Sequence, residues 1–437
     1  MEPIIPIEVH AFLKLSVYLA CPIDECYNSV MQRLNYRRIL AFTGILSLML
    51  YYGLYWVNLL NDPDERTGSD FSGFYALGRI TQEKGIQHIY DMAEQERIEE
   101  WLVGHPVTVI FNTHLPFVAP IFAALVDENY IASFKRWALI LLLLNALNVS
   151  ILVSLLDIKR FTRENSLLLI LGVFFFDPTV SGFMNGQDIS LVLLGMAIWL
   201  WGMTSQKYFV AGLGLSLTTV RPQVALFLAI PFFFKQRRVF WGFVLGSSIL
   251  AGLSIWLLKM DGALKYIESL RYIESTIWIE PHSFDMPTIS GIIRRNFAVT
   301  NPTLAKTFVW ICYLAGIVIF SAWWYRSSEI TEKHIGLITI FGIFLLPYAH
   351  YHELTLLLIP IFCLLRILQR DNLVDQFYLA VIPLIVSWLS ALGYVGSGSL
   401  KFPIMYTVMF ILGYLLINPY KFSRALQNSK AQTVKGL

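Results

Sequence analysis

Uninterrupted apolar runs are the feature that most constrains what this chain can fold into. The first run, residues 39–60, matches the roughly 20 residues that a helix needs to cross a bilayer. Similar runs recur almost to the end, and the chain is 56% hydrophobic and 14% charged, whereas a soluble domain carries about 25% charged residues. The sequence therefore predicts an all-α polytopic membrane protein.

Twelve segments are predicted as transmembrane helices, although several are shorter than the usual span of about 17 to 25 residues. They are residues 39–60, 134–156, 166–176, 189–204, 208–219, 222–234, 239–258, 304–325, 334–346, 353–369, 374–394 and 403–419.

Basic residues occur in alternate connections between these segments. Lys and Arg precede the first predicted span and follow the second, sixth, tenth and last. The positive-inside rule assigns this side, with both termini, to the cytoplasm. Residues 61–114 carry ten acidic and four basic residues, so we expect two long loops, about 61–133 and 259–303, on the opposite side.

The predicted spans form one transmembrane domain, residues 39–419. A cytoplasmic or interfacial segment, 1–38, precedes it, and a basic cytoplasmic tail, 420–437, follows. Residues 106–126 are apolar but contain three prolines. We expect a re-entrant or surface-lying segment there, because a further span would invert every later charge assignment.

Asp70 is the first candidate site residue, because it lies in the segment SDFSGFY among small and aromatic residues. Burial of a carboxylate is costly unless the group is paired or useful. Tyr75 and Tyr90, in the same predicted outer loop, are candidate substrate-binding residues.

Asn185 and Gln187 lie in the turn NGQD just before a predicted span. Asn-Gly is a turn signal in its own right. The backbone donors at the start of the following helix, together with its positive dipole end, also favour an anion or a sugar hydroxyl. We therefore expect both side chains to bind substrate.

Arg221 and Gln223 lie between two apolar stretches too short to be comfortable spans, which favours a hairpin with Arg221 at its tip. An arginine at membrane depth is costly and indicates function, and a guanidinium suits phosphate. A structural ion pair or a snorkelling side chain is the alternative.

His350 and His352 stand beside Glu353 in the predicted junction of the ninth and tenth spans. Their i, i+2 spacing does not place two ligands on one helix face, so a hydrogen-bonding rim is favoured over zinc. We expect no metal and no cofactor.

These segments, in this order, resemble glycosyltransferase family 87. The resemblance runs over about residues 69–353 and rests on SDFSGFYALGR, GIQHIYD, NGQ, AGLGLSLTTVRPQ, KQRR and LPYAHYHE. It implies the GT-C fold and a polyprenyl-phosphate sugar donor. It also implies that Asp70 is the catalytic acid of the first outer loop, and that Arg221 is the family's basic residue before proline.

Two segments depart from the family's pattern. His114-Leu115-Pro116 stands where Tyr-Pro-Pro is usual, and the late loop is rich in histidine where a single polar residue, His350 or His352 here, is common.

The predicted reaction moves a sugar, such as mannose or another hexose or a pentose, from the donor to a lipid or glycan with inversion. Asp70 is the general base and Arg221 meets the charge of the leaving phosphate. We expect a bacterial inner-membrane enzyme with an extracytoplasmic site, in contact with membrane lipids and without nucleic acid.

A transporter or flippase of lipid-linked sugars is one alternative. The chain shows no internal repeat of the kind many transporters have, which disfavours this alternative. A membrane glycan polymerase or ligase, which shares the donor class, stays open.

Overall fold

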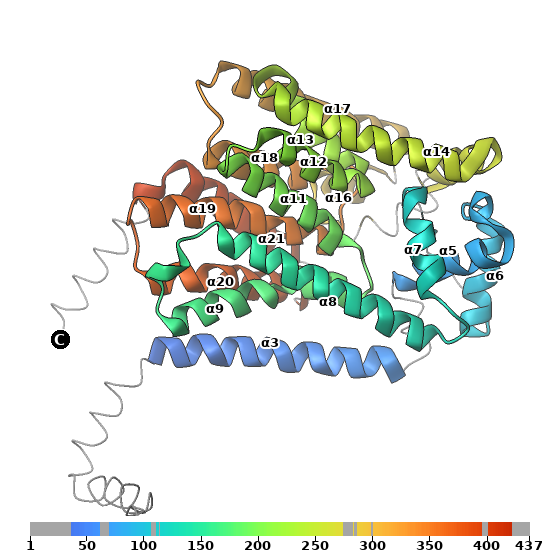
Figure 1. The fold of residues 1–437 in the computed structure, drawn as a ribbon, viewed down its shortest axis with the longest axis horizontal. Coiled ribbons are helices and arrows are strands. Elements are labelled where there is room, and N and C mark those ends of the chain that lie inside the picture. Colours follow the sequence, from blue (N-terminus) through green and yellow to red (C-terminus); the bar gives the residue numbers. More distant parts are fainter. Residues whose placement is uncertain are drawn as a thin grey trace, which may run out of the picture.

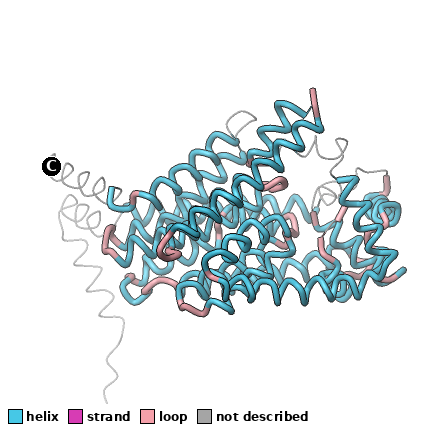
Figure 2. The backbone as a smooth tube through the Cα atoms, turned by 90° about the horizontal axis from the view of Figure 1, so that it is seen from above, coloured by secondary structure: helices cyan, strands magenta, loops and turns pink. Residues whose placement is uncertain are grey.

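The computed structural model of the chain (Figure 1) describes residues 36–61, 70–105, 111–112, 114–273, 283, 286–298, 300–395 and 401–421. Most of the predicted N-terminal segment 1–38 and of the tail 420–437 lies outside these ranges. The described residues form helices and loops and no strand (Figure 2), which confirms the all-α class.

The helices follow one another with short connections. Their bounds are α3 (Tyr36–Asn61), α5 (Phe71–Lys84), η1 (Ile86–His88), α6 (Met92–Val103), η2 (Pro116–Val118), α7 (Ala119–Leu125), α8 (Tyr130–Ser154), η3 (Ile158–Arg160), α9 (Arg163–Phe174), α10 (Asp177–Met184), α11 (Ile189–Thr204), α12 (Tyr208–Ser216), η4 (Leu217–Val220), α13 (Pro222–Lys235), α14 (Arg237–Ile273), α16 (Ile289–Ile293), the π-helix η6 (Arg294–Ala298), α17 (Pro302–Arg326), α18 (Glu332–Leu345), η7 (Tyr351–Leu357), α19 (Leu358–Arg370), α20 (Gln376–Val395) and α21 (Lys401–Ile417).

Five helical segments among the described residues are long and apolar enough to cross a membrane. They are Arg38–Asn58, Tyr130–Ser154, Arg237–Ile273, Pro302–Arg326 and Tyr351–Arg370. A sixth span is possible if α9 and α10, which bend by 45° at their junction, act together. The protein is therefore a membrane protein, while the count of twelve stays a prediction because several apolar helices have only 10–17 residues.

Helices α11, α12 and α13 run back and forth beside one another. At Gly202 a Cβ atom would lie 2.8 Å from the Cα of Ala211, so α11 and α12 approach more closely than larger side chains allow. The chain then breaks between η4 and α13 at Arg221. This brings Arg221 back to the end of the bundle at which α11 begins, as the predicted hairpin requires.

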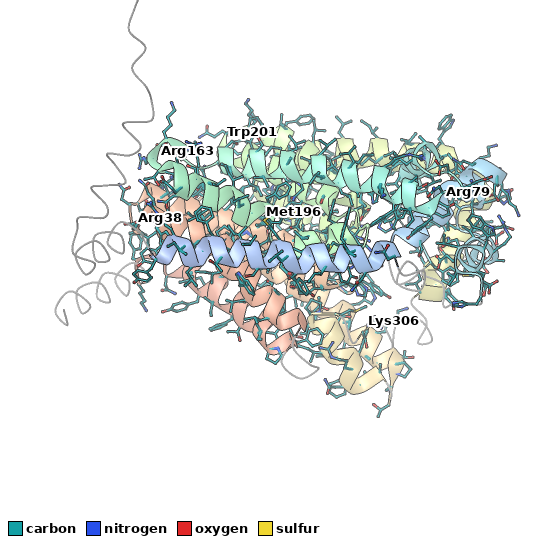
Figure 3. The ribbon with its side chains drawn as sticks, turned by 90° about the horizontal axis from the view of Figure 1, so that it is seen from below. Arg38, Arg79, Arg163, Met196, Trp201 and Lys306 are labelled. Carbon is teal, nitrogen blue, oxygen red and sulfur yellow. The ribbon has the colours of Figure 1, made fainter. Side chains whose placement is uncertain are left out.

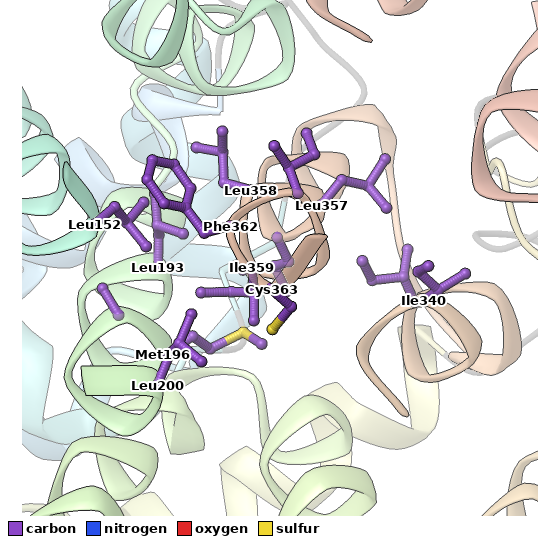
Figure 4. Packing of buried hydrophobic residues seen from close by; sticks show 14 of the residues in the cluster. Leu152, Leu193, Met196, Leu200, Ile340, Leu357, Leu358, Ile359, Phe362 and Cys363 are labelled. Carbon is purple, nitrogen blue, oxygen red and sulfur yellow. The ribbon is translucent and has the colours of Figure 1, made fainter. Parts of the chain in front are cut away.

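Helix α19, preceded by η7, lies in the centre of the bundle, and 94% of the residues in its apolar window are buried. Leu358, Ile359 and Phe362 pack against Leu152 of α8 and Leu193 and Met196 of α11 (Figure 4). Close packing holds helices together in a membrane, because lipid tails are as apolar as the side chains. The centre of the fold therefore fixes η7, the segment that carries His352 and Glu353.

Helices α5, α6 and α7 form a separate group at one end of the long helices (Figure 1). Their apolar side chains make a second core, which includes Phe71, Phe74 and Phe122. Helix α7 has seven residues, far fewer than a span requires, and fits the prediction of a segment that does not cross the membrane.

Helix α14 continues past the predicted end of its span at residue 258. Lys259 adopts a left-handed conformation (φ 55°), after which the helix runs on to Ile273. An ion pair from Lys265 to Asp91 and contact of Gly262 with Gln87 hold this extension against η1. The first part of the predicted outer loop, residues 259–273, is therefore helical, because loss of apolar character marks the end of the hydrophobic stretch and not the end of the helix. Its position outside the membrane stays a prediction.

Arginines lie at both ends of the bundle. Arg38 and Arg163 lie at one end and Arg79 at the other (Figure 3). Arg38 reaches Glu164 at 3.7 Å and thereby links α3 to α9.

Candidate functional site

A chain of five charged or ionisable side chains crosses the interior where α11, α13 and η7 begin. We call it the charge chain, and its members are His114, Asp188, Arg221, Glu353 and His352. The contacts in order are His114 Nε2 to Asp188 Oδ2 at 3.2 Å, Asp188 Oδ1 to Arg221 Nη2 at 3.1 Å, Arg221 Nε to Glu353 Oε1 at 3.5 Å, and Glu353 Oε2 to His352 Nε2 at 3.2 Å.

Three members of the charge chain lie at helix starts. Asp188 is the N-cap residue of α11, and Arg221 precedes Pro222, the first residue of α13. Glu353 is the third residue of η7, and its Oε2 accepts a hydrogen bond from the backbone N–H of His350 at 2.6 Å. Three helix starts that are far apart in the sequence therefore meet at one point.

The NGQD turn has a backbone that only glycine adopts easily. Gly186 has φ +74°, and a Cβ atom there would lie 2.6 Å from the Cβ of Phe71. The backbone N–H of Phe71 donates to the carbonyl of Asn185 at 3.0 Å, and the Trp137 indole donates to the carbonyl of Gly186 at 2.7 Å. These bonds hold the start of α5 against the turn.

Asp70 is the N-cap residue of α5 and is half-buried, while Phe71 to Leu77 are buried. Its carboxylate is close enough to interact electrostatically with the Arg221 guanidinium and the His352 imidazole. The structure thus brings together the acid and the guanidinium that the sequence analysis singled out.

Arg221 is both ion-paired and partly open. Its Nη2 donates to Gln187 Oε1 at 2.6 Å and to Asp188 at 3.1 Å, while its Nε faces Glu353. Its Nη1 has no hydrogen-bond partner among the residues that the structure describes, and 15% of the side chain is exposed. One edge of the guanidinium is therefore fixed, and the other can bind a ligand.

Asp188 stays ionised in this setting. Burial by itself raises the pKa of its carboxyl group, but His114 and Arg221 outweigh burial and bring that pKa down to about 2. Above this pH, Asp188 therefore carries a full negative charge between the Arg221 guanidinium and the His114 imidazole.

The predicted tyrosines lie outside the charge chain. Tyr75 is fully buried in the second core, and its hydroxyl donates to the carbonyl of Asp127 at 2.7 Å. Tyr90 is also buried, and its hydroxyl donates to the backbone carbonyl of His114. The structure therefore places Tyr90 where it positions His114, and Tyr75 where it ties α5 to the start of α8.

Gln223 and Asn185 lie next to the charge chain. The side-chain amide of Gln223 donates to the carbonyl of Tyr348 at 3.5 Å, and the backbone carbonyl of Gln223 accepts from the Tyr313 hydroxyl at 2.7 Å. Asn185 Oδ1 accepts from Tyr55 of α3 at 3.3 Å. The imidazoles of His350 and His352 are stacked with their centroids 5.9 Å apart.

Three members of the charge chain, His114, Asp188 and Glu353, were not among the predicted site residues. Each was adjacent to a predicted residue or motif, but the sequence did not reveal the pairing between them. Asp177 was missed entirely: its carboxylate accepts from the hydroxyls of Tyr52 and Tyr351, and its backbone N–H donates to Ser387 Oγ at 2.8 Å.

A cavity of about 410 Å³ opens beside the charge chain. Its walls come from η2, η4, α13 and α14, and its surface is almost wholly apolar. Leu115 follows His114 and Pro222 follows Arg221, so two lining residues are direct neighbours of charge-chain members.

No group of three His, Cys, Asp or Glu side chains within the described part of the chain could hold a metal ion. The histidines of the site face carboxylates, in a pairing that gives ion pairs and hydrogen bonds.

The model of glycosyltransferase family 87 matches residues 113–347, which is more than half of the 437-residue chain. The chain belongs to glycosyltransferase family 87. No curated protein and no solved structure matches it. The protein is therefore a glycosyltransferase, and the match includes His114, the NGQD turn and Arg221. Asp70 and the segment from His350 to Glu353 lie outside the matched range.

Proposed function

We propose that this family 87 enzyme transfers a sugar from a polyprenyl-phosphate donor to a lipid or glycan acceptor. One observation carries the proposal: the half-buried carboxylate of Asp70 interacts electrostatically with the Arg221 guanidinium, which has an open edge, and Pro222, next to Arg221 in the chain, lines an apolar cavity. These are the groups that a reaction between a hydroxyl and a lipid phosphate ester of a sugar requires.

Asp70 is the general base. It takes the proton from the acceptor hydroxyl as that oxygen forms a bond to the anomeric carbon. The bond from this carbon to the phosphate oxygen breaks, and the lipid phosphate departs with the electron pair. Displacement from the opposite face inverts the anomeric centre. A positioned base contributes roughly 10² to 10⁴ in rate.

Arg221 stabilises the departing phosphate. Its Nη1 can donate hydrogen bonds to a phosphate oxygen while Nη2 stays on Gln187 and Asp188. Charge-assisted bonds of this kind are about twice as strong as neutral ones. Gln223, two residues further along, is the second residue that we assign to the same phosphate.

The apolar cavity receives the first part of the polyprenyl chain. Its volume of about 410 Å³ lies within the range of roughly 300–1,000 Å³ that is usual for ligand pockets. The prolines at its edge, Pro116 and Pro222, follow closely on charge-chain residues, so lipid and phosphate can be bound together.

Polar side chains of the NGQD turn and the late loop bind the sugar and the acceptor. Asn185, Gln187, His350 and His352 offer donors and acceptors of the kind that sugar hydroxyls need. The sugar is mannose or another hexose or a pentose.

The site faces away from the cytoplasm of a bacterial inner membrane in a GT-C fold of about twelve spans, and the reaction needs no cofactor. The Lys and Arg residues in alternate connections support the orientation, because such residues favour the cytoplasmic side.

The proposal is tested with purified protein and a panel of radiolabelled polyprenyl-phosphate sugars. We expect the wild type to transfer label from one of them to membrane lipid or glycan, and Asp70→Asn to lose transfer by at least about 100-fold. Asp261→Asn, which removes an exposed acid from α14, is the matched control and keeps the wild-type rate.

Wild-type activity in Asp70→Asn would show that another group is the base. Movement of intact donor across vesicles without transfer would favour a flippase. Joining of whole lipid-linked glycans would favour a polymerase or ligase.

A further inference from the structure

Asp177 is a buried acid that the proposed reaction does not use. It is the first residue of α10, and only 3% of it is exposed. If α9 and α10 together form one span, this carboxylate lies at membrane depth. An acid at such a depth is costly and indicates a function by default. The charge chain is close by, because the NGQD turn follows α10 directly.

The two carboxylate oxygens of Asp177 accept hydrogen bonds from two different elements. Oδ1 accepts from the Tyr52 hydroxyl of α3, and Oδ2 accepts from the Tyr351 hydroxyl of η7. The backbone N–H of Asp177 donates to Ser387 Oγ of α20 at 2.8 Å. An asparagine side chain would offer one acceptor oxygen in place of two. The acid therefore joins both α3 and η7 to the start of α10.

Helix α10 and η7 pack against each other, and they meet again towards the other end of α10. A Cβ atom at Gly182 would lie 3.2 Å from the Cβ of His352 and 2.7 Å from Cγ2 of Ile189. A larger residue would force one of these neighbours to move. Contacts at Asp177 and at Gly182 thus hold η7 against α10 at two points.

Each of these two segments leads to groups that hold Arg221. Gln187 and Asp188, in the turn after α10, accept hydrogen bonds from Nη2 of Arg221. Glu353, two residues after Tyr351 in η7, has its Oε1 at 3.5 Å from Nε of Arg221. The position of η7 relative to α10 therefore sets the orientation of the guanidinium and of its open Nη1.

We infer that Asp177 is a positioning residue for donor binding. Through the Tyr351 hydroxyl it fixes η7 against α10, so that Glu353 and the NGQD turn together orient the open edge of Arg221 toward the donor phosphate. The inference rests on the proposed donor class. Asp177 acts at a distance, since the eight residues of α10 extend about 12 Å between this carboxylate and the turn.

The two tyrosines provide a matched pair of variants. Tyr52 and Tyr351 are both 5% exposed, and both donate to the same carboxylate. Tyr351 belongs to η7, whereas Tyr52 belongs to α3, a helix with only 17% of its apolar window buried. Replacement by phenylalanine removes the same kind of hydrogen bond at either position, but only Tyr351 holds a segment that contacts Arg221.

The test is a donor titration with the purified enzyme and the radiolabelled polyprenyl-phosphate sugar that the wild type transfers most rapidly. We expect Tyr351→Phe to raise the KM for the donor about tenfold, because η7 loses its hydrogen bond to α10 and the guanidinium loses its fixed orientation. The KM for the acceptor stays close to the wild-type value.

Tyr52→Phe is the matched control. It lowers the thermal unfolding midpoint by an amount similar to that of Tyr351→Phe and keeps the wild-type donor KM.

Asp177→Val removes both acceptor oxygens and also raises the donor KM. Addition of Tyr351→Phe to this variant changes the donor KM little further, because residues that act through one shared contact are not additive. If Asp177→Val does not fold, the two tyrosine variants decide the matter.

A donor KM in Tyr351→Phe no higher than in Tyr52→Phe, in an enzyme whose wild type transfers sugar, overturns the inference and leaves the proposed function intact. A purely structural carboxylate gives this result, since it affects stability in both variants alike. Absence of transfer from every polyprenyl-phosphate sugar overturns both the inference and the proposed function.

Discussion

The described residues include two five-membered ion-pair chains that differ chiefly in burial. The charge chain has side-chain exposures of 3–15%. The other, which we call the surface chain, lies on α5 and α6 and has exposures of 17–47%. Its members in order are Arg79, Glu83, Arg97, Glu94 and Lys84.

The difference separates exposed ion pairs, whose desolvation costs little free energy, from buried ion pairs, whose desolvation costs much more. Exposed pairs contribute about 0–1 kcal/mol each, and salt screens them. A buried pair carries a desolvation penalty of several kcal/mol per ion, so apolar residues would often be at least as stable in its place. We therefore interpret the surface chain as ordinary stabilisation of two helices. We interpret the charge chain as a functional site, because stability alone does not explain it.

The largest effect is expected from Asp188→Asn. This change removes the shared partner of His114 and Arg221 and leaves a buried guanidinium only partly compensated, which typically costs about 3–5 kcal/mol. We expect a marked fall in the thermal unfolding midpoint in detergent and loss of sugar transfer. Unchanged stability would mean that loss of one partner from the charge chain costs no more free energy than a similar loss from the surface chain.

A smaller effect on binding is expected from Ala251→Trp, which fills the cavity beside the charge chain. Ala251 is an exposed residue of α14 that lines the cavity. The donor KM should rise about tenfold, since loss of a few buried methylene contacts at roughly 0.8 kcal/mol each produces a change of this size.

Ile249→Trp is the control for this experiment, because Ile249 is 61% exposed on the same helix and does not line the cavity. Equal donor KM values for the two variants would show that the cavity is not part of the donor site.

The smallest effect is expected from Glu83→Gln in the surface chain. Partial burial raises the pKa of Glu83, but hydrogen bonds from Arg97 and Arg79 outweigh it, so the pKa lies below the usual value. A lowered carboxyl pKa gives stability above the unfolded-state pKa of about 4.3, and this stability is lost as the pH falls through the folded-state pKa.

We therefore expect Glu83→Gln to cost less than about 1 kcal/mol at pH 7, to cost less near pH 3 than at pH 7, and to leave sugar transfer unchanged. Thermal unfolding at the two pH values measures this. A loss comparable to that of Asp188→Asn would contradict the contrast between the two chains.

The sequence was sufficient for the helical class, because apolar runs and their flanking charges are local properties of the chain. It also singled out Asp70 and Arg221, since each was a charged residue in an unsuitable apolar setting. The sequence did not reveal the partners of Arg221. Asp188 and Glu353 are 33 and 132 positions away, and only the packing of α11, α13 and η7 brings them together.

The helical extension from Lys259 to Ile273 was missed for a related reason. Its side chains are mixed in polarity, and the contacts that hold it, such as the ion pair from Lys265 to Asp91, come from a distant part of the sequence. Asp177 was missed because its tyrosine partners come from α3 and η7, which are distant in the sequence.

The short lengths of α11 and α13 have a consequence for the membrane itself. Their 16 and 14 residues extend about 24 and 21 Å, less than the roughly 30 Å of a hydrocarbon core. As predicted spans with their far ends at the cytoplasmic surface, these helices would place Arg221 and Asp188, at their starts, below the level of the headgroups. We then expect the turnover rate to change with bilayer thickness, because thickness sets how far polar headgroups and water must reach down to these two side chains.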